Sequence, residues 1–226
     1  MRSRMAVWCS GIESVTLMGW TYTGNDVLAS TAMRLFKDRV RPCALSPYIF
    51  MTDPERVPDI LRSSAALPKG STLIYRHFGA ENRRDMARAL RQICFVRSLQ
   101  FLIGQDEALA YDVGADGLHL PEKDLKRGKV LRARYPNWLL SGAVHSPASL
   151  EHVDGLDGMI LSCVFKSESS SASVPLGVEK LRAVAHTSPI SVFALGGICR
   201  KNVHELIGSG VAGIAGVAAF GGDQHD

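Results

Sequence analysis

Short apolar runs recur along the chain from residue 45 onward, and helical patterns fill the intervals between them. The runs occupy residues 48–52, 72–76, 101–104, 117–120, 138–142, 158–162, 190–195 and 213–217. They are apolar on both faces instead of alternating, which is typical of strands buried in a parallel sheet with helices outside it. The pattern therefore predicts eight β/α units.

Eight such units within one chain fit either a closed barrel or an open sheet with helices on both sides. An open dinucleotide-binding sheet would carry GxGxxG after its first strand, but "FMTDPERVP" stands there. We therefore predict the α/β class, with a single (β/α)8 (TIM) barrel formed by residues 45–226 and an N-terminal helical extension.

The chain before the barrel follows a different pattern. Residues 1–20 match no element of the barrel, and we expect them to form a disordered extension. Residues 21–44 contain apolar positions at near-helical spacing within 24–40, which predicts an N-terminal helix. We expect this helix to cover the lower end of the barrel, where the strands begin.

Composition and charge narrow the class of protein. A net charge of +4 in 226 residues is too small and too dispersed to favour nucleic acid. No apolar run approaches the roughly 20 residues of a membrane span, and the N-terminus lacks an apolar core of signal-peptide length. The five cysteines lack metal-binding spacing. We therefore expect a cytoplasmic protein with reduced thiols and a small-molecule partner.

Polar residues at the carboxyl ends of the strands are the candidate site residues, because barrel enzymes build their active sites there. They are Asp53, Arg76, His77, Gln105, His119, Glu122, Asp124 and His145, together with the loop after residue 162. The serine-rich stretch 165–177 in that loop is expected to act as a mobile lid.

Small residues follow the last two strands. Loops at this position commonly bind phosphate through backbone N–H groups, which an anion approaches most closely where no side chain intervenes. The candidate phosphate-binding residues are Gly196, Gly197, Gly216, Val217 and Ala218. The alternative explanation is tight packing between strands and helices, for which small residues are equally suited.

Three of the candidate side chains have structural alternatives. The guanidinium of Arg76 suits a substrate carboxylate or phosphate, but it could instead form an ion pair with Asp53 or Asp124. His119 lies within a strand and could be a hydrogen-bonded core histidine. His145 could cap a helix or lie free on the surface.

Several motifs together give the chain a family likeness. "GADGLHLPEKD", "HS" after the fifth strand, the serine-rich segment ending in "PLG", and "ALGGI…GIAGVAAF" resemble the thiamine-phosphate synthase/TenI family over about residues 47–221. The resemblance implies a phosphate-binding barrel in vitamin B1 biosynthesis, with a phosphorylated thiazole or thiamine phosphate as ligand. Dimers are common in this family, so a homodimer is expected as well.

The synthase branch, which joins a thiazole phosphate to a pyrimidine diphosphate with Mg²⁺ and releases pyrophosphate, is matched incompletely. Of its two metal carboxylates, Asp124 matches, while Gly104-Gln105 replaces the other. Its two pyrophosphate lysines are replaced by Phe78 and Ser170. Each lost charge contact would cost on the order of 2–4 kcal/mol of transition-state stabilisation. The resemblance thus implies a weakened synthase, unless Lys166 or His77 substitutes.

The TenI branch isomerises a thiazole carboxylate phosphate, which requires one acid/base and an anion site but no cofactor. The resemblance places His145, in "AVHS", in the acid/base role, because an imidazole can accept and return a proton near neutral pH. The residues expected to bind substrate are Arg76, His77, His119, Ser167 and Ser169. Three hypotheses follow: a metal-independent isomerase, a Mg²⁺-dependent synthase, and a non-catalytic binder of a thiamine precursor.

Overall fold

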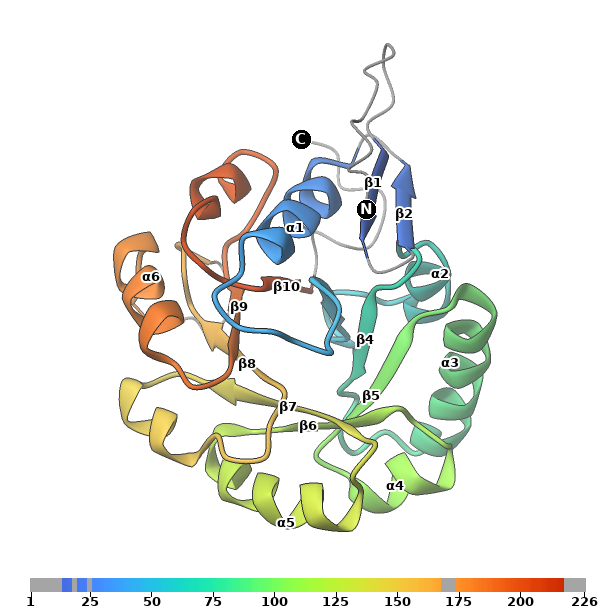
Figure 1. Ribbon diagram of the computed structural model, residues 1–226. Helices are drawn as coiled ribbons and strands as arrows, with labels where there is room; N and C mark the ends of the chain where they lie inside the picture. Colours follow the sequence, from blue (N-terminus) through green and yellow to red (C-terminus); the bar gives the residue numbers. More distant parts are fainter. Residues whose placement is uncertain (1–13, 18–19, 24–25, 168–173, 218–226) are drawn as a thin grey trace, which may run out of the picture.

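The computed structural model describes residues 14–17, 20–23, 26–167 and 174–217 as a closed barrel with an N-terminal hairpin and helix (Figure 1). Eight parallel strands pair in the order β10-β3-β4-β5-β6-β7-β8-β9. Their bounds are Tyr48–Met51 (β3), Thr72–Tyr75 (β4), Gln100–Gly104 (β5), Gly117–Leu120 (β6), Leu139–Val144 (β7), Gly158–Ser162 (β8), Ser191–Leu195 (β9) and Gly213–Gly216 (β10). Each coincides with one predicted apolar run, which confirms the TIM-barrel prediction.

Helices surround the barrel and are mostly short. They are Val27–Lys37 (α1), Ile60–Ala65 (α2), Arg83–Arg97 (α3), Glu107–Asp112 (α4), Gly128–Arg134 (α5) and Val178–Thr187 (α6), with 3₁₀ helices at Glu122–Arg127 (η1), Pro147–His152 (η2) and Val203–Leu206 (η3). Within the described ranges, none of them has the length and hydropathy needed to cross a membrane.

Alternation along the strands separates two apolar layers. Ile74, Leu102 and Phe193 belong to the cluster inside the barrel, whereas their neighbours Leu73 and Phe101 pack with the surrounding helices. Both faces of each strand are therefore buried, which explains the continuous apolar runs in the sequence. The same alternation determines which polar residues point inward at the upper end, where the strands finish.

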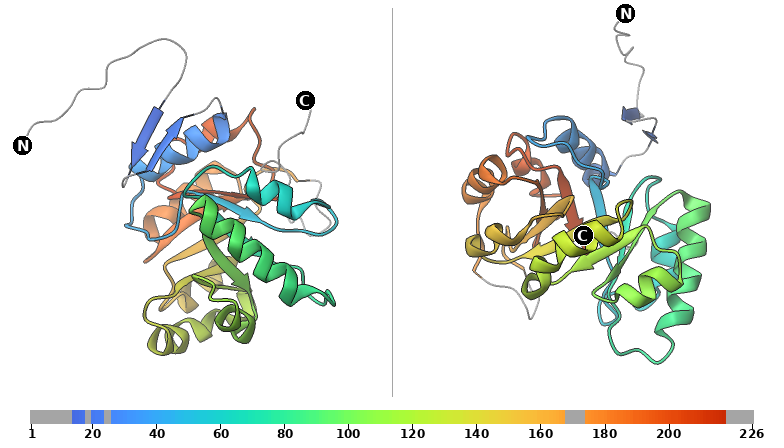
Figure 2. Two further views of the ribbon diagram at one scale, coloured as in Figure 1. Left: turned by 90° about the vertical axis from the view of Figure 1, so that its right-hand side faces the viewer. Right: turned by 60° about the horizontal axis from the view of Figure 1, so that its bottom comes forward.

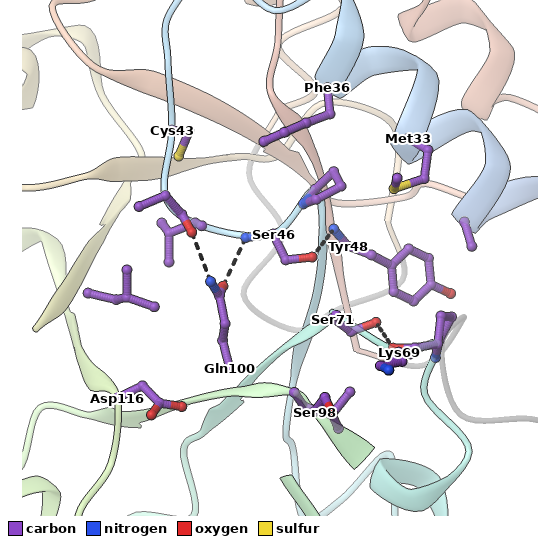
Figure 3. A pocket seen from close by; sticks show the side chains of 18 of the residues that line it. Met33, Phe36, Cys43, Ser46, Tyr48, Lys69, Ser71, Ser98, Gln100 and Asp116 are labelled. Atoms are coloured by element: carbon purple, nitrogen blue, oxygen red, sulfur yellow. Dashed lines mark hydrogen bonds between the residues drawn. The ribbon is translucent and has the colours of Figure 1, made fainter. Parts of the chain in front are cut away.

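The segment 38–47 closes the lower end of the barrel. Its residues Cys43 and Leu45 belong to the inner cluster, and Figure 1 shows the segment crossing the barrel opening. The side chain of Gln100 holds it, because Nε2 donates to the carbonyl of Ala44 (2.8 Å) and Oε1 accepts from the N–H of Ser46 (2.9 Å; Figure 3). The lower end is thus covered by this segment together with Phe36 of the helix Val27–Lys37, which also belongs to the inner cluster.

The predicted N-terminal helix exists as α1, and most of its buried side chains face the outer layer, while Phe36 joins the inner cluster. It contacts β10, β3 and η3, and Leu28, Ala32 and Leu35 are buried in the outer apolar layer. Two strands that the sequence pattern did not predict, Ser14–Leu17 (β1) and Trp20–Thr23 (β2), pair antiparallel beside α1 (Figure 2). Residues 1–13 of the expected extension lie outside the described residues.

Candidate functional site

Polar side chains gather at the upper end of the barrel, on β4, β6, β7 and β8. Arg76 and Ser162 stand two residues after Ile74 and Ile160, which both belong to the inner cluster. His119 stands between Leu118 and Leu120, which both belong to the outer layer. By alternation all three side chains point into the barrel, so neighbouring strands converge on one polar region.

Arg76 stands just after β4 and is anchored there by hydrogen bonds to Thr52. Its N–H donates to Thr52 Oγ1 (2.9 Å), and its Nε donates to the carbonyl of Thr52 (3.0 Å). Burial lowers the pKa of Arg76, and the nearby Asp53 opposes that shift. No salt bridge joins Arg76 to any acidic residue within the described ranges, Asp53 and Asp124 included, so its two terminal nitrogens remain able to bind an anion.

His119 is a buried neutral imidazole. Its side chain is 5% exposed, and its Nδ1 lies 2.9 Å from Ser141 Oγ. Burial, together with smaller electrostatic contributions from Arg76 and His145, lowers the pKa of His119 to about 3. His119 therefore cannot carry a charge at neutral pH, although it can hydrogen-bond a ligand.

We predict that His119 makes the protein less stable in mild acid. The unfolded chain protonates this histidine below about pH 6.5, while the folded protein keeps it neutral until about pH 3. Lowering the pH from 7 to 5 should therefore remove about 2 kcal/mol of the free energy of unfolding through His119 alone. Urea unfolding of the wild type and of His119→Asn at pH 7 and pH 5 measures how much of the lost free energy of unfolding is due to His119. Equal pH dependence in the two proteins would contradict the prediction.

His145 lies at the mouth of the barrel, just after β7. Its ring Nδ1 is 2.8 Å from Ser162 Oγ, and its backbone N–H donates to Glu122 Oε1 (2.9 Å). The same carboxylate oxygen accepts the N–H of Ser146 (3.0 Å) and the hydroxyl of Ser149. Burial alone would raise the pKa of Glu122, but these hydrogen bonds hold it below its usual value. The carboxylate thus fixes the backbone that carries His145.

His77 is placed differently from the other candidates. Its ring packs against that of Tyr75, with centroids 5.1 Å apart, and Tyr75 belongs to the layer between strands and helices. Burial lowers the pKa of His77, partly offset by Asp53, and its buried Nε2 has no hydrogen-bond partner. His77 therefore lies beside the helices and away from the inward-pointing group around Arg76.

The carboxylates needed for a metal site are not brought together. Asp124 lies in η1, and Gln105 stands where the second metal carboxylate was expected. No cluster of three or more His, Cys, Asp or Glu side chains occurs in the portion of the chain that the structure covers. One carboxylate with an amide is a poor donor set for Mg²⁺ and pyrophosphate, so these residues do not fit the synthase metal centre.

The glycines after β9 are required by a close contact within the chain. Gly196 and Gly197 have φ values of +102° and +65°, and a Cβ at Gly197 would lie 2.3 Å from the carbonyl of Lys166. The N–H of Phe165 donates to the carbonyl of Gly196 (3.0 Å). The packing alternative therefore explains these two glycines. Whether the same loop binds phosphate with Gly216 and Val217 stays a prediction, and Ala218 and Ser169 lie outside the described residues.

Replacing Gly197 with alanine should destabilise the fold. The new Cβ meets the Lys166 carbonyl and requires a backbone conformation that is strained for alanine. We expect urea unfolding to show a loss of about 2–4 kcal/mol, from strain and overpacking together. Gly79→Ala is the matched control, because Gly79 has φ +76° but nothing within 4 Å of the added Cβ. Equal losses in both variants would contradict the importance of the contact.

A cavity lined by described residues lies away from these side chains. It measures about 650 Å³ and opens at the lower end, between α1, the segment 38–47 and the amino ends of β4–β7 (Figure 3). A small hollow of about 20 Å³ borders His145 and Ser162. The candidate chemistry is therefore separate from the cavity at the lower end.

Sequence reasoning nominated Arg76, His119, Glu122 and His145, but it missed their supporting partners. Ser162, Ser141 and Thr52 are ordinary residues of apolar runs, and only their inward positions relate them to the site. Counting two residues on from the inward Ile160 would have indicated Ser162. The bond from Glu122 to the backbone of His145 has no comparable signal, because it joins separate β/α units.

Comparisons with known proteins converge on one family. The family model described as thiamine monophosphate synthase matches residues 49–220. The bifunctional thiamine biosynthesis protein ThiED of Geobacter sulfurreducens is 30% identical over 71% of this chain, which spans 34% of that protein. The thiamine-phosphate synthase of Listeria monocytogenes is 28% identical over 69% of this chain and 78% of its own. A solved thiamine phosphate pyrophosphorylase from Pyrococcus furiosus aligns with a TM-score of 0.66 and 26% identity, covering 78% of this chain and 88% of its own.

Proposed function

Because this chain belongs to the thiamine monophosphate synthase family, a family of thiamine biosynthesis, we propose that it is a metal-independent isomerase of a thiazole carboxylate phosphate. The observation that carries the proposal is that one barrel mouth holds both an anchored, exposed imidazole and an arginine that forms no salt bridge within the described ranges. His145 supplies a proton acceptor and donor, while Arg76 supplies a positive charge for an anionic group. Together they meet the requirements of tautomerisation.

In the proposed reaction His145 removes a proton from one position of the thiazole ring system and returns it to another. The nitrogen that exchanges the proton is Nε2, because Nδ1 faces Ser162. Arg76 holds the ring carboxylate through its terminal nitrogens, and neutral His119 offers a further hydrogen bond. The phosphate binds at the loops after β9 and β10, near Gly196, Gly197, Gly216 and Val217. Ser167 precedes the part of the loop after β8 that lies outside the described residues.

A direct assay tests the proposal. The purified protein should interconvert the tautomers of the thiazole carboxylate phosphate, followed by ultraviolet absorbance or proton NMR, and EDTA should leave the rate unchanged. A preparation that releases pyrophosphate from the pyrimidine diphosphate only with Mg²⁺, and does not interconvert the tautomers, would overturn it.

The synthase reaction is the second candidate, because several relatives carry that name. The sequence positions Asp124, Arg76, Ser167 and Ser169 favour this reading, which would make the chain a transferase, although the described residues do not fit its metal centre. A binder without catalysis is the third candidate. A thermal melt combined with the activity assays identifies a binder: thiazole phosphate at 100 times its dissociation constant adds about 2.7 kcal/mol of stability, yet neither reaction takes place.

A further inference from the structure

The ring of His145 is held by a residue of the next strand. Parallel pairing of β7 and β8 sets Val144 opposite Leu161, so that His145 and Ser162 follow as neighbours beyond the paired residues. Their side chains meet with Nδ1 2.8 Å from Oγ. In the described part of the chain, Ser162 Oγ makes no other hydrogen bond. The serine is therefore directed at the imidazole.

The backbone of His145 is fixed independently of this contact. Glu122 Oε1 accepts the N–H groups of both His145 (2.9 Å) and Ser146 (3.0 Å). With the backbone held, the ring can still turn about its side-chain bonds. The contact with Ser162 restrains that rotation and gives the two ring nitrogens different roles.

We propose that Ser162 is a positioning residue that accepts a hydrogen bond from Nδ1–H of His145 and so leaves Nε2 as the nitrogen that exchanges protons with the ligand. The proposal rests on the acid/base role of His145 proposed above. A proton leaves one atom of the substrate, forms a bond to Nε2, and then returns to another atom. Nδ1 keeps its proton throughout, and Ser162 neither gains nor loses one.

A serine suits this position because its hydroxyl oxygen accepts from Nδ1–H in both the neutral ring and the imidazolium. Alanine would leave Nδ1 without this partner, so the ring could rotate and its proton could move to Nε2. A neutral ring with the proton on Nε2 can no longer accept a proton there. Removing the hydroxyl should therefore impair turnover without removing any group that binds the ligand.

The test compares Ser162→Ala and Ser162→Thr with the control Ser191→Ala. The control also removes a hydroxyl from a barrel strand, but at the lower end, where Ser191 Oγ donates to the carbonyl of Arg41. We expect Ser162→Ala to lower kcat about tenfold with KM changed less than twofold, because small displacements of a reacting group reduce rate. Ser162→Thr should restore most of the rate, and Ser191→Ala should leave it unchanged.

Nitrogen-15 NMR of the histidine side chains supplies a second measurement that does not depend on turnover. The resonances absent from His145→Gln identify His145. In the wild type its neutral ring should carry the proton on Nδ1, and Ser162→Ala should show a mixture of both tautomers. A wild-type ring protonated on Nε2 would overturn the proposal, even if Ser162→Ala failed to fold. Absence of isomerase activity with the expected tautomer would instead reject the proposed function alone.

Discussion

Replacing His145 with glutamine should lower the isomerisation rate constant by a factor of about 10²–10⁴, the usual contribution of a positioned acid/base. Glutamine keeps a polar side chain next to Ser162 but cannot accept and return a proton. Because His145 is exposed and its backbone is held by Glu122, the fold should be retained. Stopped-flow absorbance measures the rate, and ligand-induced thermal stabilisation measures binding.

The matched control for this variant is His186→Gln. His186 is an exposed histidine in the last turn of α6, so it experiences the same substitution far from the barrel mouth. It should retain the wild-type rate. A His145→Gln protein that turns over within threefold of the wild type would remove His145 from the acid/base role.

Replacing Arg76 with alanine should weaken binding of the thiazole carboxylate phosphate by about 10- to 100-fold. Its guanidinium has no carboxylate partner within the described ranges, so a ligand anion would gain a charge-assisted contact of about 1.5–3 kcal/mol. The affinity of Arg76→Lys for the ligand should lie between those of the wild type and Arg76→Ala, because an ammonium keeps the charge but loses the planar pair of donors. Isothermal titration calorimetry measures the dissociation constants.

A second ligand, thiazole phosphate without the ring carboxylate, tests whether Arg76 binds the carboxylate itself or affects the whole site. If Arg76 holds the carboxylate, the variant and the wild type should bind thiazole phosphate about equally. If affinity falls equally for both ligands, Arg76 instead interacts with the phosphate or shapes the whole site. Either result is interpretable only when the thermal stability of Arg76→Ala matches that of the wild type.

The barrel could be predicted from the sequence because its strands are buried on both faces. Runs such as 158–162 and 190–195 stay apolar without alternation, and their spacing leaves room only for short helices. The segment 38–47 was less predictable. It has no periodic pattern of apolar residues. Its attachment depends on hydrogen bonds from Gln100, a polar residue that the sequence alone would place on the surface.

The candidate site was predictable in its residues but not in its connections. Strand ends nominate Arg76 and His145 without knowledge of the structure, whereas the contact between His145 and Ser162 depends on the register of β7 against β8. For Gly196 and Gly197, the sequence indicated that a contact exists but did not identify the partner. Their small size indicated a close neighbour after β9, but the sequence could not show that this neighbour is the backbone of Lys166.

The segment 38–47 also determines how the domain can be excised. The family match begins at residue 49, so a fragment cut at that boundary would discard the floor of the barrel along with the hairpin. Leu45, which is 1% exposed, would then be missing from beneath Ile49 and Phe193, and the inner layer would open to water. The smallest unit expected to fold by itself therefore begins before this floor and is longer than the region the family shares.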